Sequence, residues 1–319
     1  MNFELYSINQ LGVIDQKDEY VSLHLTGLFG DIIHASTRFE YILNQYPNYK
    51  WIIFHSYPVQ HRALGRIKIA YRNLLKPLVD NNILKYYFYS TFGRPGQHGY
   101  QIPEIISAVK FSKAYPDRYF DCVITNTKVP NMNSPYLGIT IPEQKDSTKA
   151  VILRKSTWHG HFPERNRPML EWYKIEKKLL ECGYTVYLLG VDDDYSNPNK
   201  LIDFRRKFGI RETLEFTKDA SICITPATFL YVWTQFVCPT AVLSDSRDVN
   251  NLNTNWKLNN NMCVFDTSLE NYMDVLFQFI EDTSEGKRRI NFYNNSRIIK
   301  AESVIISNYK KRIIERAAY

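Results

Sequence analysis

Residues 25–35 read Leu25-Thr26-Gly27-Leu28-Phe29-Gly30-Asp31-Ile32-Ile33-His34-Ala35 and carry the chain from an expected strand into an expected helix. Apolar and polar residues alternate over residues 20–25, which is typical of a β-strand. Apolar residues at helical spacing follow as far as Leu43, and Asp31 stands where a capping carboxylate begins a helix. A strand, a glycine turn and a helix N-terminus in this order predict a ligand-binding crevice at the carboxyl end of a parallel sheet. An ordinary N-cap in a βα unit is the alternative.

The same alternation of strands and helices continues through the chain. In the first part, Tyr46-Pro47 ends the first helix because proline cannot continue it. We expect further strands at 51–54, 84–89 and 120–125, and helices over 59–79 and 103–115. The polar stretch 142–149 has no core residues and marks the expected domain boundary. Beyond it we expect strands at 150–153, 185–190, 220–225 and 240–243, and helices over 168–182, 198–208, 226–236 and from 268 onward.

This order predicts an α/β protein with two Rossmann-like domains that face each other across a cleft. We expect an N-terminal domain over 1–147, a C-terminal domain over 148–300, and a C-terminal helix over 301–319 that returns to the first domain. A length of 319 residues suits two domains.

The composition is that of a globular protein, with 44% hydrophobic and 23% charged residues. No apolar run is long enough to cross a bilayer, and the N-terminus has no signal-peptide pattern, so we expect a cytoplasmic protein. Five dispersed cysteines without a C-x-x-C pair indicate reduced thiols. The net charge of +7 permits an anionic partner without choosing among glycan phosphates, membranes and nucleic acids.

Three sequence blocks point to a known family. The first is Gly30–Ala35, followed by Tyr46-Pro47. The second runs from the expected strand at 150 to Trp172 and includes Pro168 four residues before that tryptophan. The third is the strand-turn-helix of residues 220–243. With these blocks the chain resembles the heptosyltransferase family of glycosyltransferases, which have the GT-B fold of two Rossmann-like domains. Phage DNA glycosyltransferases, also of GT-B fold, are a more distant likeness.

The third block departs from the family pattern. Pro226-Ala227-Thr228 stands where the family has Asp-Thr-Gly, and Tyr231 stands where it has a histidine. The resemblance therefore supports the fold and glycosyl transfer better than it supports a heptose donor.

The resemblance implies an inverting transfer with Asp31 as the general base. Such a reaction needs a base for the acceptor hydroxyl and positive charge or amide dipoles for the leaving diphosphate. His34, three residues on, lies on the same helical side and is expected to orient the base or touch the acceptor; a structural histidine is the alternative.

The other expected site residues divide between two substrates. Strand ends and helix starts in the second domain supply the donor-binding candidates, which are Arg154, Lys155, Ser156, Arg165, Arg167, Gly190 and Thr228. The first domain receives the acceptor in GT-B enzymes, and its candidates are Gly27, Gly30, Arg62, Arg66, Arg94 and His98. For each cation alone, a solvated surface position is the alternative.

We expect a nucleoside diphosphate sugar as co-substrate, no cofactor, no metal and a monomer. Neither Asp192-Asp193-Asp194 nor the pair His159 and His161 makes a convincing metal site. The basic acceptor candidates predict an anionic acceptor, either a phosphorylated lipopolysaccharide-type glycan or hydroxymethylated DNA, in a bacterial or phage-infected cell. A sugar-nucleotide epimerase of the same fold and a non-catalytic nucleotide-sugar-binding protein remain alternatives.

Overall fold

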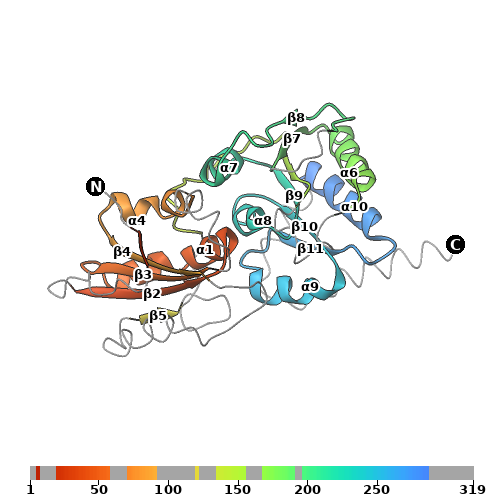
Figure 1. The fold of residues 1–319 in the computed structure, drawn as a ribbon. Helices are drawn as coiled ribbons and strands as arrows, with labels where there is room; N and C mark the ends of the chain where they lie inside the picture. The colour runs from red at the N-terminus through yellow and green to blue at the C-terminus, as the bar shows by residue number, and fades with distance from the viewer. Residues whose placement is uncertain are drawn as a thin grey trace.

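The computed structural model describes residues 5–7, 19–57, 70–91, 119–121, 134–155, 167–190 and 196–286. Within them the chain forms two parallel β-sheets, the first from the N-terminal half and the second from the C-terminal half, with helices packed on both (Figure 1). The strand order is β1-β4-β3-β2-β5 in the first sheet and β11-β10-β9-β6-β7-β8 in the second.

The first sheet belongs to the N-terminal half. Its strands are β1 (Leu5–Ser7), β2 (Tyr20–Thr26), β3 (Lys50–Tyr57), β4 (Leu84–Thr91) and β5 (Tyr119–Asp121). Its described helices include α1 (Phe29–Ser36), α2 (Phe39–Gln45) and α4 (Lys76–Asp80). The helix expected up to Leu43 is thus divided in two, and Ser36 and Thr37 turn their hydroxyls back onto the carbonyls of Ile33 and His34 at the break.

The second sheet belongs to the C-terminal half. Its strands are β6 (Lys149–Leu153), β7 (Thr185–Leu189), β8 (Ile202–Asp203), β9 (Ile222–Pro226), β10 (Thr240–Ser244) and β11 (Met262–Asp266). Its helical segments are α6 (Met169–Glu181), α7 (Ile210–Thr217), α8 (Phe229–Thr234), α9 (Ser246–Asn251), the π-helical η5 (Leu252–Trp256) and α10 (Tyr272–Ser284). The central strands β6, β9 and β10 are buried throughout, as parallel strands covered on both faces should be.

One expected element is wrong. Residues 198–208, expected as a helix, instead contain the short edge strand β8, in which Ile202 pairs with Tyr187 of β7. Lys200 and Arg206 on either side have φ of 55° and 61°, a left-handed conformation that interrupts a right-handed helix. Strand β11 and helices α7 and α9 had no sequence-based expectation. The expected C-terminal helix 301–319 lies outside the described residues.

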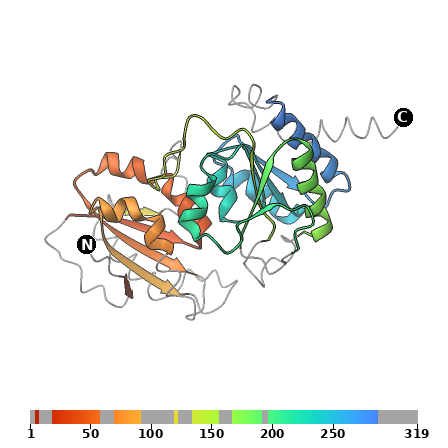
Figure 2. The same ribbon diagram turned by 90° about the horizontal axis from the view of Figure 1, so that it is seen from above.

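The helices of the second sheet cover opposite faces. Helices α6 and α10 lie side by side on the outer face of the sheet (Figures 1 and 2). They bury Trp172, Leu179 and Phe279 against it. On the inner face, α7 and α8 bury Leu214 and Trp233 in a core that is continuous with the core of the first sheet.

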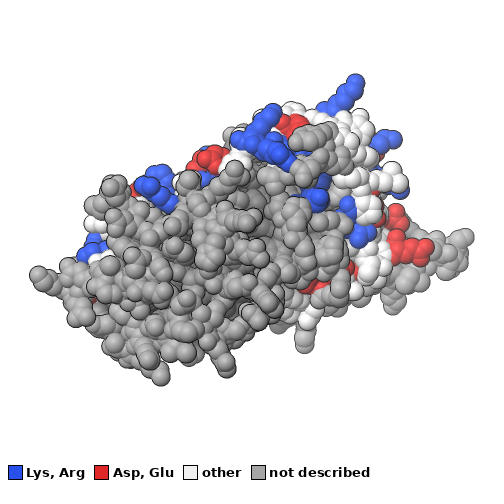
Figure 3. Space-filling model, in the orientation of Figure 1, with Lys and Arg blue, Asp and Glu red and all other residues white. Residues whose placement is uncertain are grey.

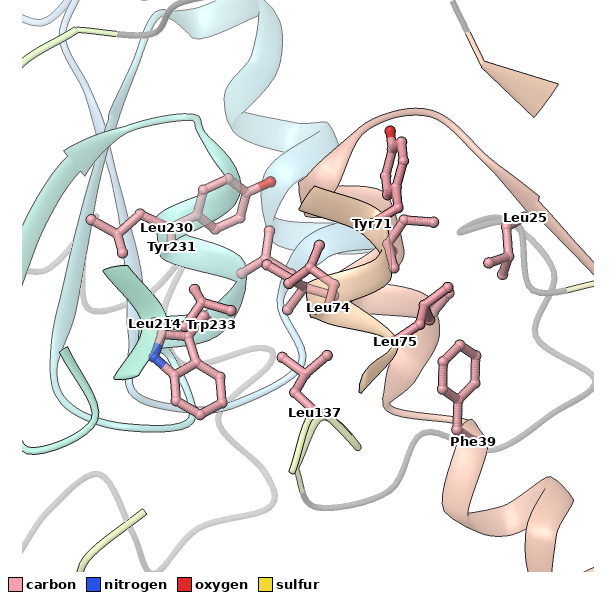
Figure 4. Close-up of a cluster of buried hydrophobic side chains, with 14 of the residues drawn as sticks. Leu25, Phe39, Tyr71, Leu74, Leu75, Leu137, Leu214, Leu230, Tyr231 and Trp233 are labelled. Atoms are coloured by element: carbon pink, nitrogen blue, oxygen red, sulfur yellow. The ribbon is translucent and has the colours of Figure 1, made fainter. Parts of the chain in front are cut away.

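This shared core joins the two halves. Leu25, Leu74 and Leu75 from the first half and Leu230 and Trp233 from the second belong to one buried cluster (Figure 4). Between the halves, α1 packs against α8. The expected α/β class with two Rossmann-like halves is confirmed, and this arrangement is that of the GT-B fold.

A polar clasp reinforces the junction. Arg211 of α7 donates from Nη1 to the carbonyls of Asn73 and Leu137, at 3.0 and 2.9 Å, and from Nη2 to that of Gly138 at 3.2 Å. Its Nε donates to Glu215 one turn on, at 2.8 Å. One guanidinium of the second half thus satisfies three backbone carbonyls of the preceding segments.

Candidate functional site

The loop between β2 and α1 is shaped around the Asp31 carboxylate. Asp31 lies in the first turn of α1 and is partly exposed, and its Oδ2 accepts a hydrogen bond from the Leu28 amide at 2.6 Å. Gly27 has φ of 84°, and a Cβ there would run into the carboxylate. Glycine at this position is therefore required both by the backbone conformation and by the space that Asp31 occupies.

Three aromatic side chains that the sequence did not point to support this loop, two by direct hydrogen bonds and the third through one of those two. His55, near the carboxyl end of β3, has its Nε2 2.9 Å from the Gly27 carbonyl oxygen, and the Tyr71 hydroxyl donates to the same oxygen at 3.3 Å. The Tyr87 hydroxyl of β4 contacts His55 Nδ1. A histidine that closes a short apolar strand beside β2 was the available signal for this contact.

His34 lies in the junction between the halves. It is buried, its Nε2 is 3.1 Å from the carbonyl oxygen of Asn255, and its ring meets that of Trp256 edge-on. Burial, assisted by the nearby charge of Arg38, lowers the pKa of His34 to about 3. A buried neutral imidazole between α1 and η5 joins the two halves, and the expected catalytic role of His34 stays a prediction.

The carboxyl edges of the two sheets adjoin at this point. Gly30 of α1 packs on α8, and a Cβ at Gly30 would lie 3.4 Å from Phe229 Cα. Because α1 follows β2 and α8 follows β9, the loops after these two strands are neighbours. Thr228 in the second loop has its Oγ1 3.1 Å from that of Thr225 and accepts from the Leu230 amide at 3.3 Å.

Four of the expected donor-binding positions share one edge of the second sheet. Strands β9, β6 and β7 are adjacent and parallel, so Thr228 after β9, Arg154 and Lys155 after β6, and Gly190 after β7 follow neighbouring strand ends. Gly190 has φ of 108°, and its carbonyl accepts from the Arg206 amide at 2.7 Å. Each of these residues was expected at the end of a strand or the start of a helix, and the strand order brings those strand ends side by side.

Arg154 is less accessible than expected for a donor-binding cation. Its guanidinium is buried and donates from Nε to Glu176 Oε1 at 2.7 Å and from Nη1 to the Ser196 carbonyl at 2.9 Å. Asn199 donates to the other oxygen of Glu176 at 3.0 Å. Within the described chain Arg154 Nη2 is buried without a hydrogen-bond partner, so one donor of this ion pair is unused.

Arg167 precedes α6 and pairs with its own helix. It donates to both carboxylate oxygens of Glu171, at 2.9 and 3.1 Å, and Glu171 also accepts from the Tyr272 hydroxyl of α10. This cluster ties α6 to α10 on the outer face of the sheet. The donor-binding role of Arg167 stays a prediction.

Several expected residues lie outside the described chain. They are Arg62, Arg66, Arg94, His98, Ser156 and Arg165, together with His159, His161 and Asp192–Asp194. Among the residues that the structure describes, no group of three His, Cys, Asp or Glu side chains could hold a metal ion. The described helices include none long and apolar enough to span a membrane. On the face in Figure 3, described Lys and Arg side chains are interspersed with Asp and Glu along the upper rim.

Comparisons with known proteins identify fold neighbours. No protein-family model and no curated protein sequence matches the chain. Solved structures similar to it include ADP-heptose lipopolysaccharide heptosyltransferase II of E. coli, with 12% identity, TM-score 0.49, and 85% of this chain and 99% of that chain covered. An E. coli heptosyltransferase with ADP has 12% identity and TM-score 0.47, with coverage of 83% and 99%. A family 9 glycosyl transferase from Veillonella parvula has 12% identity and TM-score 0.47, with coverage of 93% and 98%.

Proposed function

We propose that this protein is a glycosyltransferase that moves a sugar from a nucleoside diphosphate sugar to a hydroxyl of an anionic acceptor, with inversion and without a metal. The observation that carries the proposal is the position of Asp31. Its partly exposed carboxylate lies beside the junction where the loops after β2 and β9 adjoin. Ligands of open α/β sheets bind outside the carboxyl ends of the strands, and here two such edges adjoin.

In the proposed reaction Asp31 acts as general base. The carboxylate takes the proton of the acceptor hydroxyl as its oxygen attacks the anomeric carbon, and the bond from that carbon to the diphosphate breaks on the opposite face. The leaving nucleoside diphosphate then needs compensating positive charge or hydrogen-bond donors. Lys155 and the unused Nη2 of Arg154, at the end of β6, are the described candidates for this role.

Donor binding is the first test. Thermal unfolding is measured with a panel of nucleoside diphosphates and their sugars, beginning with ADP and ADP-heptose, the ligands named for two of the fold neighbours. A ligand present at a hundred times its dissociation constant should stabilise the folded chain by about 2.7 kcal/mol. No shift with any nucleotide sugar would contradict the proposal.

Transfer is the second test. A stabilising donor is incubated with lipopolysaccharide-type phosphorylated glycan or with hydroxymethylated DNA, and nucleotide release and acceptor glycosylation are followed. We expect Asp31→Asn to lower the transfer rate about 10²- to 10⁴-fold, since it removes the base, and to leave donor binding nearly unchanged. Transfer that survives this substitution would refute the assignment of the base.

The same assay separates the alternatives. Isomerisation of the nucleotide sugar without any acceptor would indicate an epimerase, and donor binding without turnover would indicate a binding protein. Acceptor binding that weakens steeply with salt would indicate DNA, because salt competes with contacts to its phosphates.

A further inference from the structure

The carbonyl of Gly27 receives hydrogen bonds from two different elements. His55 of β3 approaches it through Nε2 at 2.9 Å, and Tyr71 donates its hydroxyl proton to it at 3.3 Å. His55 and Tyr87 are buried, and Tyr71 is almost fully buried. A partly exposed loop is thus anchored to the interior at one oxygen.

The protonation of this group follows from its partners. A carbonyl oxygen can only accept, so His55 Nε2 carries a proton and donates it to Gly27. Burial lowers the pKa of His55 to about 3, so the ring is neutral and Nδ1 is an acceptor. The Tyr87 hydroxyl therefore donates to Nδ1. The hydrogen bonds are therefore donated in one direction, from Tyr87 to His55 and from His55 to the Gly27 oxygen.

The chain of hydrogen bonds continues through a peptide group. The Gly27 carbonyl and the Leu28 amide belong to the same planar unit, and the Leu28 N–H donates to Asp31 Oδ2 at 2.6 Å. A carbonyl that accepts hydrogen bonds polarises its own peptide, which strengthens the N–H on the other side as a donor. The strands set this path, because β4, β3 and β2 are adjacent and Leu25 of β2 lies opposite His55.

We propose that His55 and Tyr87 are positioning residues for Asp31 and act on its carboxylate through the Gly27–Leu28 peptide group. They hold the plane of that peptide, and the peptide holds Oδ2 in one orientation toward the acceptor. This inference rests on the proposed function for its kinetic consequence. The hydrogen-bond path itself is independent of that function.

The sequence permits a direct observation of the peptide. Gly27-Leu28 is the only Gly-Leu pair in the chain, so labelling glycine with ¹³C at the carbonyl and leucine with ¹⁵N isolates one amide signal in a carbonyl-filtered NMR spectrum. We expect a high-frequency proton shift and slow exchange in the unsubstituted protein. His55→Leu and Tyr87→Phe should both move this signal to lower frequency.

A matched control comes from the neighbouring residue of the same strand. Tyr86 lies on the face of β4 opposite to Tyr87 and stacks on Phe88, so Tyr86→Phe should leave the Leu28 signal in place. Thermal unfolding of each variant establishes that it is folded. A Leu28 signal that does not move in His55→Leu or Tyr87→Phe would overturn the proposal, whatever the protein catalyses.

Kinetics give the second readout. His55→Leu should lower kcat about 10- to 100-fold, the scale of a small misplacement of a catalytic group, with little change in the KM for the donor. His55→Gln keeps an N–H donor at a similar reach and should recover most of the loss. Unchanged kcat in His55→Leu would overturn the positioning role. If the unsubstituted protein transfers no sugar, the proposed function fails, and the Leu28 signal still decides whether the path exists.

Discussion

The loops after β2 and β9 solve the same structural problem in different ways. Each connects a buried parallel strand to the helix that follows it, at the junction of the two halves. The first uses Gly27 at positive φ and folds the Asp31 carboxylate back onto the Leu28 amide. The second has no glycine and begins α8 with Thr228, whose hydroxyl accepts from the Leu230 amide.

The loop after β2 is stabilised by hydrogen bonds from other elements, whereas the loop after β9 is stabilised by hydrogen bonds within itself. The Thr228 hydroxyl bonds only to groups within a few residues along the chain among the contacts that the structure describes, as an ordinary helix cap does. The loop at Asp31 depends in addition on His55 and Tyr71, which come from other elements. A carboxylate whose orientation is set by neighbouring strands is better suited to chemistry than one that merely caps a helix.

Of the substitutions that test this difference between the loops, Gly27→Ala should cause the largest loss of stability. Alanine at φ of 84° costs about 1–2 kcal/mol, and its Cβ meets the Asp31 carboxylate, so we expect a loss of about 2 kcal/mol or more in urea unfolding. The displaced carboxylate should also reduce transfer. Gly30→Ala is the matched control. Gly30 has no positive φ, and its Cβ would make an ordinary contact with Phe229, so stability should change by less than about 1 kcal/mol. Equal losses in both variants would remove the special role of Gly27.

The junction beside the first loop should be sensitive to acid. The pKa of His34 in the folded state is about 3, below the ordinary value of 6.5, so protons bind preferentially to the unfolded chain. Its contribution is complete above pH 6.5 and is lost as the pH falls toward 3, at about 1.4 kcal/mol per pH unit. From pH 6.5 to 5 this amounts to about 2 kcal/mol in urea unfolding. His34→Gln should remove this part of the slope and leave the similar part that His55 contributes, because the pKa of His55 is also lowered to about 3. An unchanged slope in the variant would mean that His34 does not titrate in this way.

The clasp on the other side of the junction should have a similar or smaller effect. Arg211→Ala removes charged donors from the carbonyls of Asn73, Leu137 and Gly138, and we expect a loss of about 2 kcal/mol in urea unfolding. Glu215→Ala removes only the ion pair, whose carboxylate partner is about half exposed, and should cost less than about 1 kcal/mol. If both variants lose the same stability, the ion pair rather than the carbonyl contacts explains the role of Arg211.

The smallest effect is expected in the second loop. Thr228→Ala removes one capping hydroxyl and should lower the free energy of unfolding by about 1 kcal/mol, while Thr228→Ser keeps the cap and should stay close to the unsubstituted protein. The Leu28 amide signal should be unchanged in both. A change there would show that the two loops depend on each other more than their separate hydrogen bonds indicate.

Much of this architecture was predictable because local patterns agree with the fold. Alternating and continuous apolar runs identified β2, β3, β4, β6, β7, β9 and β10, and their strand-helix order predicted two parallel sheets. The prediction of a helix at 198–208 was wrong because this segment contains an edge strand. Lys200 and Arg206 also adopt left-handed conformations, for which the sequence has no recognisable pattern. The sequence also predicted that Arg154, Gly190 and Thr228 each follow a strand, and the strand order then places these strand ends next to one another.

The two α/β halves and the place of Asp31 in the first βα turn were predictable from the amino-acid sequence, because they follow from the spacing of apolar residues and from the glycine-aspartate loop. The surroundings of Asp31 were not predictable in this way, because they come from segments far apart in the sequence. His55 and Tyr87 reach Gly27 because β3 and β4 lie beside β2, and His34 is buried because η5 of the second half covers it. Such contacts depend on strand order and on the packing of the halves, which the chain acquires only when distant segments meet.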